Sequence, residues 1–327
     1  MKLTIGTRGS ALARAQANDV ARRLTAAGHR VDVAVISTLG DRAATEPFAD
    51  VGAFGIFVRE IEAALIAGDI DIAVHSYKDI PSTSPQSLVI ASVPERLDPA
   101  DLLLICRDAT DDSAAHFPLR NGVRVGTSAA RRTAWLRAAR PDLVTLPLRG
   151  NVPTRVASLC DGKYDAIVLA AAGIARLERL TDGDRLELPP TITVVRLDPT
   201  RFVPAPSQGA IALQVRADRS AVIAAAGGIN DVTTARALRA EREALRLAEG
   251  GCTLPFGAWC SGVDGQLRLT VALGLEDGTI ARGAKTGTNP DALARAAWAE
   301  LRATAGIDAV ESPSGPAPVA ASASGLS

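Results

Sequence analysis

The strongest constraint on the fold of this chain is an alternation of apolar strands and amphipathic helices through its first two thirds. Residues 3–5, 31–36 and 70–74 have the apolar content of buried strands. The segments between them carry apolar residues at helical spacing, with Ser10 placed to cap the first helix and residues 55–67 forming the second. Because such alternation is typical of sheets whose strands run mostly parallel, we predict an α/β protein.

A weak internal repeat indicates two related units. The first pair consists of residues 5–8 (IGTR) and 125–128 (VGTS), and the second of residues 68–74 (GDIDIAV) and 162–168 (GKYDAIV). Two similar α/β lobes facing one another would explain both pairs, although two short βα units can also resemble each other by chance. Ligands of open α/β sheets bind beyond the carboxyl ends of the strands, where both repeated turns would lie.

The pattern changes after about residue 217. One helix rich in Arg, Ala and Leu is predicted over residues 231–248, followed by three short strands with turns at 263–265 and 276–278. A last helix over about 290–304 starts with Asn-Pro, a capping residue followed by a helix-starting proline. We therefore predict a separate small α+β domain, and we expect the Pro/Ser/Ala-rich tail from Ser312 to be disordered.

Composition narrows the functional classes. Lys and Arg total 36 and Asp and Glu also total 36, whereas a nucleic-acid-binding protein usually has a basic excess. The start of the chain, MKLTIGTRGS, is typical of a strand and not of a signal peptide, and no apolar run has membrane-spanning length. The cysteines form no CxxC pair, so a zinc cage is unfavoured. We expect a cytoplasmic protein.

Six arginines stand at predicted strand-to-helix junctions. Helix N-termini attract anions, and the guanidinium fork binds carboxylates through two hydrogen bonds. Any one of these arginines alone would best be interpreted as a surface residue, but the set indicates an anion with several charged arms, either carboxylates or phosphates. No Walker motif or GxGxxG follows a strand, which disfavours a nucleotide. The arginines are Arg8, Arg131, Arg132, Arg149, Arg155 and Arg176.

Asp79 is a candidate for acid–base work or for stabilising a developing cation. It follows Lys78 on the loop after the strand over 70–74, just before Ile80 and Pro81. The alternative is a Lys–Asp surface pair beside a proline turn.

Cys252 is the cysteine most suited to chemistry. It follows Gly250 and Gly251 on a loop after a helix, and glycines allow a ligand to approach the backbone closely. An ordinary loop cysteine is the alternative. Cys106 and Cys260 are expected in the core, and Cys160, beside Asp161 and Gly162 in a helix, is expected to have no functional role.

Together these segments resemble the porphobilinogen deaminase (hydroxymethylbilane synthase) family of tetrapyrrole and haem biosynthesis. The resembling stretches, in the family's order over residues 5–259, are IGTRGSALA, AVHSYKDIP, VGTSAARR, LRGNV with the following TR, YDAIVLAAAGIARL, PSQGAIAL and EGGCTLPFGAW. The resemblance implies two periplasmic-binding-protein-like lobes with mixed, mostly parallel sheets and a small α+β C-terminal domain. The implied boundaries are 1–96 and 198–216 for lobe 1, 101–194 for lobe 2, 218–311 for the C-terminal domain and 312–327 for the tail.

The resemblance also implies an activity and a cofactor. The family is a transferase that condenses four porphobilinogen molecules onto a dipyrromethane primer, releases ammonia at each step and then forms hydroxymethylbilane by hydrolysis. The primer would be bound by a thioether to Cys252, Asp79 would stabilise the cation formed as ammonia leaves, and Gln208 would support the interlobe hinge. Acetate and propionate arms on the pyrroles would account for the arginines. The implied cofactor residues are Cys252, Lys78, Ser128, Arg131 and Arg132, and the implied substrate residues are Arg8, Ser10, Arg149, Arg155 and Arg176.

Three positions depart from a common family pattern. Phe54 stands where many members have a lysine, so the loop over residues 52–55 is less basic, and Arg59 stands where many have a second lysine. Ala129 stands where a serine is common, which removes one hydroxyl donor to a cofactor carboxylate. We expect activity to survive these changes.

Two other classes remain as alternatives. A non-catalytic bilobed protein that binds an anion or solute would use the same lobes and arginines, but it predicts a signal peptide or a DNA-binding segment and gives Cys252 and Asp79 no role. A pyridoxal-phosphate enzyme with Lys78 as Schiff base lacks a recognisable phosphate loop. The expected partner is the small molecule porphobilinogen, with no nucleic acid and no membrane. We expect a monomer, because the sequence has no coiled coil or large apolar stripe.

Overall fold

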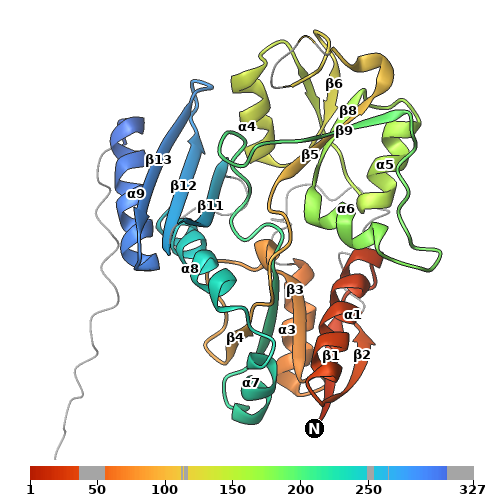
Figure 1. Ribbon diagram of the computed structural model, residues 1–327, viewed down its shortest axis with the longest axis vertical. Helices are drawn as coiled ribbons and strands as arrows, with labels where there is room; N and C mark the ends of the chain where they lie inside the picture. Colours follow the sequence, from red (N-terminus) through yellow and green to blue (C-terminus); the bar gives the residue numbers. More distant parts are fainter. Residues whose placement is uncertain (37–55, 112, 114–116, 249–253, 264, 308–327) are drawn as a thin grey trace, which may run out of the picture.

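The computed structural model describes residues 1–36, 56–111, 113, 117–248, 254–263 and 265–307. Figure 1 shows three units in this part of the chain: two lobes that each contain a sheet, one above the other, and a smaller three-stranded unit at their side. The chain is therefore an α/β protein with two lobes and a small C-terminal α+β unit, which confirms the predicted fold class. The tail predicted over 312–327 lies outside the described residues.

The first lobe is built on a five-stranded sheet with the order β2-β1-β3-β10-β4. β1 is parallel to β2 and β3, whereas β10 is antiparallel to β3 and β4. Apolar residues of α1 and α7 pack on one face of the sheet, and those of α3 pack on the other. The elements are β1 (Lys2–Thr7), α1 (Ala11–Ala26), β2 (Arg30–Val35), α3 (Ile56–Ala67), β3 (Ile72–Ser76), β4 (Leu88–Ser92), β10 (Ile211–Arg216) and α7 (Ser220–Gly227).

The second lobe has the same arrangement, with the strand order β7-β6-β8-β5-β9. β6 is parallel to β7 and β8, and β5 is antiparallel to β8 and β9. Helix α4 covers one face, and α5 and α6 cover the other. The elements are β5 (Asp101–Cys106), η3 (Arg107–Ala109), β6 (Arg124–Gly126), α4 (Ala130–Ala139), β7 (Val144–Leu146), α5 (Val152–Cys160), β8 (Ala166–Ala170), α6 (Ala171–Glu178) and β9 (Ile192–Arg196).

The internal repeat corresponds to equivalent strands of the two lobes. Gly6 of β1 pairs with β3, and Gly126 of β6 pairs with β8 at the matching register position. A Cβ on Gly6 would run into Ile70, and a Cβ on Gly126 would lie 2.8 Å from Cδ1 of Tyr164. Ile70 and Tyr164 stand at the same place in the repeat, so both glycines are required by the same close approach.

Two segments cross between the lobes and run side by side. Residues 93–100 lead from β4 to β5, and residues 197–210 lead from β9 back to β10. Leu97 donates its N–H to the carbonyl of Gly209 at 3.3 Å. Gly209 has φ +91°, and a Cβ there would lie 2.6 Å from the carbonyl oxygen of Leu97. Because these crossing segments insert β10 and β5 against the local strand direction, each five-stranded sheet is mixed, with two parallel and two antiparallel strand pairings.

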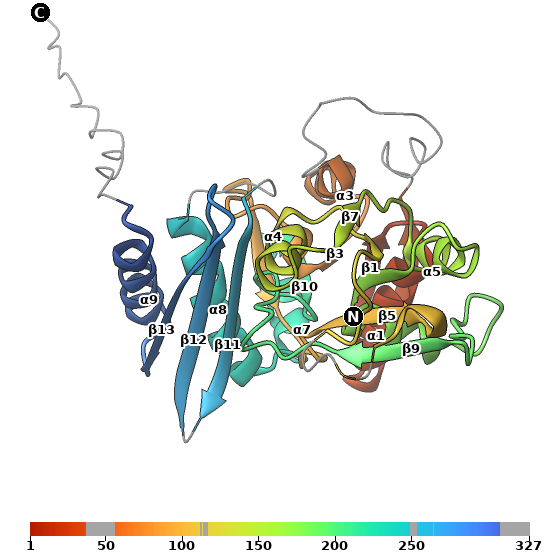
Figure 2. The same ribbon diagram turned by 90° about the horizontal axis from the view of Figure 1, so that it is seen from above.

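The C-terminal unit is a three-stranded antiparallel sheet with two helices packed on it. In the view of Figure 2 the sheet stands beside both lobes, and its β12 contacts α4 of the second lobe. Helix α9 starts at a cap made by the Asn289 side chain and ends at the left-handed Gly306. None of the helices in the described ranges is both long and apolar enough to cross a membrane. The elements are α8 (Val232–Leu247), β11 (Phe256–Val263), β12 (Gln266–Gly274), β13 (Ile280–Gly287) and α9 (Pro290–Ala305).

A buried carboxylate ties this unit to both crossing segments. Glu241 of α8 is fully buried and accepts hydrogen bonds from the guanidinium of Arg96 at 2.6 and 3.1 Å. The same carboxylate accepts from the backbone N–H of Ser207 at 2.7 Å and of Cys260 at 2.8 Å. One side chain therefore joins the first crossing segment, the second crossing segment and β11, which places α8 firmly against the lobes.

Candidate active site

Lys78 and Asp79 lie on a short 3-10 turn, η2 (Tyr77–Asp79), at the carboxyl end of the buried strand β3. The turn is anchored on both sides: Tyr77 donates its N–H to the carbonyl of Ala210, and Ile80 is buried with 1% of its surface exposed. Lys78 is half-buried and Asp79 is exposed. A fixed backbone thus presents the carboxylate of Asp79 to solvent.

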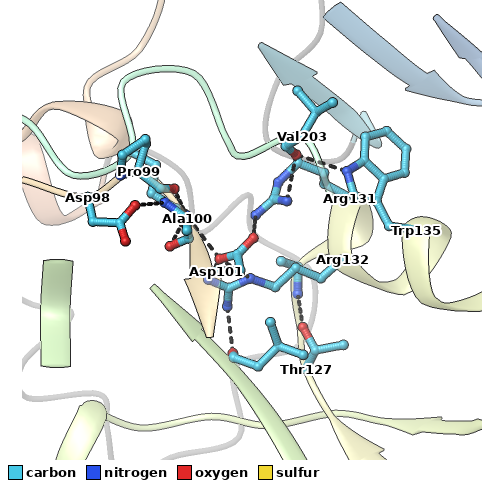
Figure 3. A network of polar contacts seen from close by, with 12 residues as sticks. Asp98, Pro99, Ala100, Asp101, Thr127, Arg131, Arg132, Trp135 and Val203 are labelled. Carbon is cyan, nitrogen blue, oxygen red and sulfur yellow. Dashed lines mark hydrogen bonds and ion pairs between the residues drawn. The ribbon is translucent and has the colours of Figure 1, made fainter. Parts of the chain in front are cut away.

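Arg131 and Arg132 belong to a buried charge cluster around Asp101 (Figure 3). Asp101 accepts from the Arg131 guanidinium at 2.8 Å and from Arg132 at 2.7 and 3.1 Å. Arg131 also donates to the carbonyl of Val203 at 2.9 Å, and Arg132 to that of Val168 at 2.8 Å. Burial alone would raise the pKa of Asp101, but the two arginines outweigh burial and hold it well below its usual range. Asp101 is therefore ionised.

The cluster keeps an excess of positive charge that extends across the lobes. Desolvation lowers the pKa of Lys78, Asp79 opposes this shift, and Arg132 of the other lobe adds to it. Desolvation also lowers the pKa of Arg155, with Arg132 adding to the shift and Asp79 opposing it. The end of β3 and the N-terminal parts of α4 and α5 thus lie within electrostatic reach of one another. Such a concentration of cations favours an anionic ligand.

Further residues of the predicted site lie on the loop after β7 or contact this loop. Arg155 on α5 donates to the carbonyl of Gly150 at 2.7 Å, and Arg149 is exposed just before it. Ser128 Oγ donates to the carbonyl of Leu148 and accepts from the N–H of Leu148, both at 2.9 Å. Ser128 therefore holds this loop against the start of α4, in addition to any contact with a ligand.

Arg8, Ser10 and Arg176 lie where the two lobes meet along α1 and α6. Ser10 caps α1 by accepting from the N–H of Ala13 at 3.3 Å, and Arg8 is half-buried in the preceding turn. Arg176 donates to the carbonyl of Gly209 at 2.8 Å. Desolvation lowers the pKa of Arg176 to about 10, and its charged neighbours are Asp19, Arg179 and Arg23. These three residues are thus placed by α1, α6 and the second crossing segment, and not by the Asp101 cluster.

Cys252 and Phe54 lie outside the described residues, so the structure does not bear on either. Cys260 is buried, and burial followed by the charge of Glu241 raises its pKa to about 12. Cys106 is half-buried with its pKa raised by burial, and Cys160 is exposed. Arg59 is exposed on α3. Ala129 stands at the N-cap of α4, where its own N–H donates to Thr127 Oγ1 at 3.3 Å.

Sequence reasoning missed Asp101 and underestimated Gln208. The Gln208 side-chain amide donates to the carbonyls of Pro99 and Ala100 and to Asp101 at 2.9 Å, so it links the second crossing segment to the charge cluster. Asp101 directly precedes the apolar run Leu102–Ile105. A carboxylate at the edge of a strand expected to be buried requires a cationic partner, and this signal could have identified it.

The fold and the site together define a class: a bilobed α/β protein with cationic groups from both lobes gathered near an exposed strand-end carboxylate. Residues 3–224 match the family described as "Porphobilinogen deaminase, dipyromethane cofactor binding domain", and residues 235–302 match "Porphobilinogen deaminase, C-terminal domain". The chain belongs to the porphobilinogen deaminase family. It is accordingly a transferase of the hydroxymethylbilane synthase type, and the cofactor of its N-terminal family domain is dipyrromethane.

Curated relatives cover most of the chain. It is 44% identical over 281 residues to the porphobilinogen deaminase of Deinococcus radiodurans, covering 85% of this chain and 86% of the relative. It is 41% identical over 281 residues to that of Syntrophobacter fumaroxidans, covering 84% and 85%. It is 40% identical over 295 residues to that of Acidothermus cellulolyticus, covering 89% and 85%.

Solved structures give a looser likeness. An arginine-specific periplasmic binding protein of Salmonella typhimurium aligns with a TM-score of 0.37 and 12% identity over 72% of this chain and 93% of that chain. The periplasmic sulfonate-binding protein SsuA of Methylobacillus flagellatus aligns with a TM-score of 0.38 and 9% identity over 74% and 67%. Scores of this size add nothing to the fold described above.

Proposed function

We propose that this protein condenses four porphobilinogen molecules head to tail on a dipyrromethane primer, releasing ammonia at each step, and then forms hydroxymethylbilane by hydrolysis. The observation that carries the proposal is the exposed carboxylate of Asp79 on a fixed turn, within electrostatic reach of cationic groups of both lobes. Family membership supports the same reaction, because the curated relatives are porphobilinogen deaminases.

The charge cluster fits a dipyrromethane with acetate and propionate arms. Lys78, Ser128, Arg131 and Arg132 would hold the group, and a thioether to Cys252 would attach it. When bound, it supplies the terminal pyrrole on which the chain is extended. Several N–H groups of Arg131 and Arg132 already donate hydrogen bonds to Asp101 and to backbone carbonyls. They would therefore act on the carboxylate arms through their excess positive charge and their remaining donors.

Asp79 would carry the repeated chemistry. Its carboxylate would accept a hydrogen bond from a pyrrole N–H and stabilise the positive charge that develops on the substrate as the C–N bond breaks and ammonia leaves. At a separation of about 4 Å and an effective dielectric of about 20, this attraction is about 4 kcal/mol, which corresponds to roughly a thousandfold in rate. The position of Asp79 is set by the turn η2.

The remaining predicted residues would hold the substrate and the growing chain. Arg149 stands on the loop after β7 and Arg155 on α5, whereas Arg8, Ser10 and Arg176 stand at the α1–α6 contact between the lobes. Carboxylate arms on successive pyrroles would contact them in turn. Their placement on different elements, at α5 and at the α1–α6 contact, supports a ligand longer than one pyrrole.

We also propose the domain boundaries and the cellular context expected above. The position of β10 in the first sheet supports assigning residues 198–216 to lobe 1, with lobe 2 over 101–194 and the C-terminal domain over 218–311. The even balance of charges supports the absence of a nucleic-acid partner. A monomer in the cytoplasm without a membrane partner is part of the same proposal. A bilobed solute-binding protein without catalysis is not favoured, because it gives Asp79 no role.

The test is turnover of porphobilinogen by the purified protein and by Asp79→Ala. The wild-type protein is expected to release ammonia and form hydroxymethylbilane, whereas Asp79→Ala should be slower by roughly a thousandfold while part of its cofactor stays attached. Asp69→Ala removes another exposed carboxylate shortly before β3 and should leave the rate unchanged. If Asp79→Ala turned over at the wild-type rate, the proposed role of this carboxylate would be wrong.

A further inference from the structure

Arg242 of α8 reaches out of the C-terminal unit to the turn that carries Asp79. Its guanidinium donates to the carbonyl of Ile80 at 2.8 Å and to the carbonyl of Pro81. The same guanidinium lies over the ring of Tyr77, 5.0 Å from the ring centroid. Desolvation lowers the pKa of Arg242, and Tyr77 and Glu241 oppose this shift. This half-buried guanidinium thus contacts two backbone carbonyls of one short segment and one aromatic ring.

These contacts bracket Asp79. Tyr77 precedes it by two residues, and Ile80 and Pro81 follow it directly. On the other side, the N–H of Tyr77 donates to the carbonyl of Ala210 at 3.0 Å, and the N–H of Ile80 closes the turn on the carbonyl of Tyr77 at 3.2 Å. The turn is therefore held at its start by Ala210, the last residue of the second crossing segment, and at its exit by α8, while the carboxylate between them is exposed.

We propose that Arg242 is a positioning residue for catalysis: through the carbonyls of Ile80 and Pro81 and the ring of Tyr77, it fixes the direction in which Asp79 points. This inference rests on the proposed function, because it needs Asp79 to act in catalysis. It gives the C-terminal unit a second task. The helix α8 binds the two crossing segments through Glu241 and also fixes the turn that carries Asp79. The turn and the crossing segments therefore share one support.

The alternative is that Arg242 only binds the C-terminal unit to the first lobe. In that case its loss would lower the melting temperature and leave the rate constant of the folded holoenzyme unchanged. A positioning role predicts a different split. Substrate affinity, which depends on the arginines of the lobes, should stay the same, whereas kcat should fall because a small displacement of a reacting group costs much of its effect.

The test compares Arg242→Met and Arg242→Lys with the matched control Arg239→Met. Arg239 lies one turn earlier on α8, and its exposed side chain pairs with Asp291 inside the C-terminal unit. Intact mass and thermal unfolding are used to confirm that each variant is folded and carries its cofactor. Arg242→Met is expected to lose about 10- to 100-fold in kcat with KM within about twofold. Arg242→Lys should be intermediate because an ammonium cannot bond both carbonyls in the same fork.

Hydrogen exchange gives a readout that does not depend on activity. In Arg242→Met the amide of Ile80 should exchange about 10-fold faster than in the wild-type protein, and in Arg239→Met it should not change. If Arg242→Met did not fold, Tyr77→Leu, which removes the ring and keeps both carbonyl bonds, should show a smaller fall in kcat. Wild-type kcat and wild-type exchange in Arg242→Met, or in Tyr77→Leu if that variant has to decide, would overturn the inference. A wild-type protein that did not convert porphobilinogen would overturn the proposed function itself.

Discussion

Replacing Asp101 with asparagine should remove the charge that holds two buried cations together. Asp101 is fully buried and accepts four side-chain hydrogen bonds, one from Arg131, two from Arg132 and one from Gln208. Asparagine keeps one acceptor oxygen but turns an amide toward guanidinium donors and leaves both cations without a counter-charge. Breaking a buried ion pair by removing one partner costs about 3–5 kcal/mol, so Asp101→Asn should lower the free energy of unfolding by that amount.

The matched control is Asp98→Asn, three residues earlier, on the first crossing segment. Asp98 pairs with Arg196 in an ion pair whose side chains are 37% and 53% exposed, and an asparagine can keep the hydrogen bond from the N–H of Ala100. Exposed pairs contribute about 0–1 kcal/mol, so this variant should unfold close to the wild-type protein. Urea unfolding followed by circular dichroism measures both. If Asp101→Asn also stayed within about 1 kcal/mol of wild type, Asp101 would not stabilise the folded protein as this cluster implies.

Two further predictions concern stability. His75 is buried beside Gln214 and burial lowers its pKa from 6.5 to about 4. Below pH 6.5 the imidazole of His75 is protonated in the unfolded chain but stays neutral in the folded chain. The free energy of unfolding should therefore fall by about 3 kcal/mol between pH 6.5 and 4. His75→Gln should reduce this pH dependence in urea titrations. Gly209→Ala should lower the free energy of unfolding by about 1–3 kcal/mol, because φ is +91° and the new Cβ would press on the carbonyl of Leu97. The matched control is Gly183→Ala, whose new Cβ meets open space and should leave the stability unchanged. Thermal unfolding measures both variants, and equal melting temperatures would refute the close approach of Gly209 to Leu97.

Much of the fold could be predicted because its determinants are local. The helices expected over 55–67, 231–248 and 290–304 correspond to α3, α8 and α9, since apolar spacing and capping residues mark them in the sequence. The repeat around Gly6 and Gly126 indicated two lobes because both glycines answer the same steric demand. The antiparallel strands β5 and β10 could not be found from strand–helix alternation, because a strand that enters a sheet from the other lobe looks the same in sequence as one that continues locally.

The candidate site was only partly predictable. Asp79 stands at the end of β3, where the chain itself indicates a ligand, and it lies within electrostatic reach of Lys78, Arg132 and Arg155. Arg176 was predicted at a strand-to-helix junction, and this was wrong, because it lies in the last turn of α6. Asp101 was not predicted, because its partners are about thirty residues away along the chain. The apolar run after Asp101 indicates that this carboxylate needs a cationic partner, but which residues supply it depends on how the lobe folds and cannot be read locally.

Intact-mass measurement of the wild-type protein and of Cys252→Ser tests the central claim most directly. The account predicts that the wild-type protein, purified from cells that make tetrapyrroles, is heavier than its sequence by one dipyrrole. Cys252→Ser should have the mass of the sequence alone, and Cys160→Ser, which removes an exposed thiol, should keep the added mass. A folded wild-type protein without added mass, or a Cys252→Ser variant that retained it, would contradict the account.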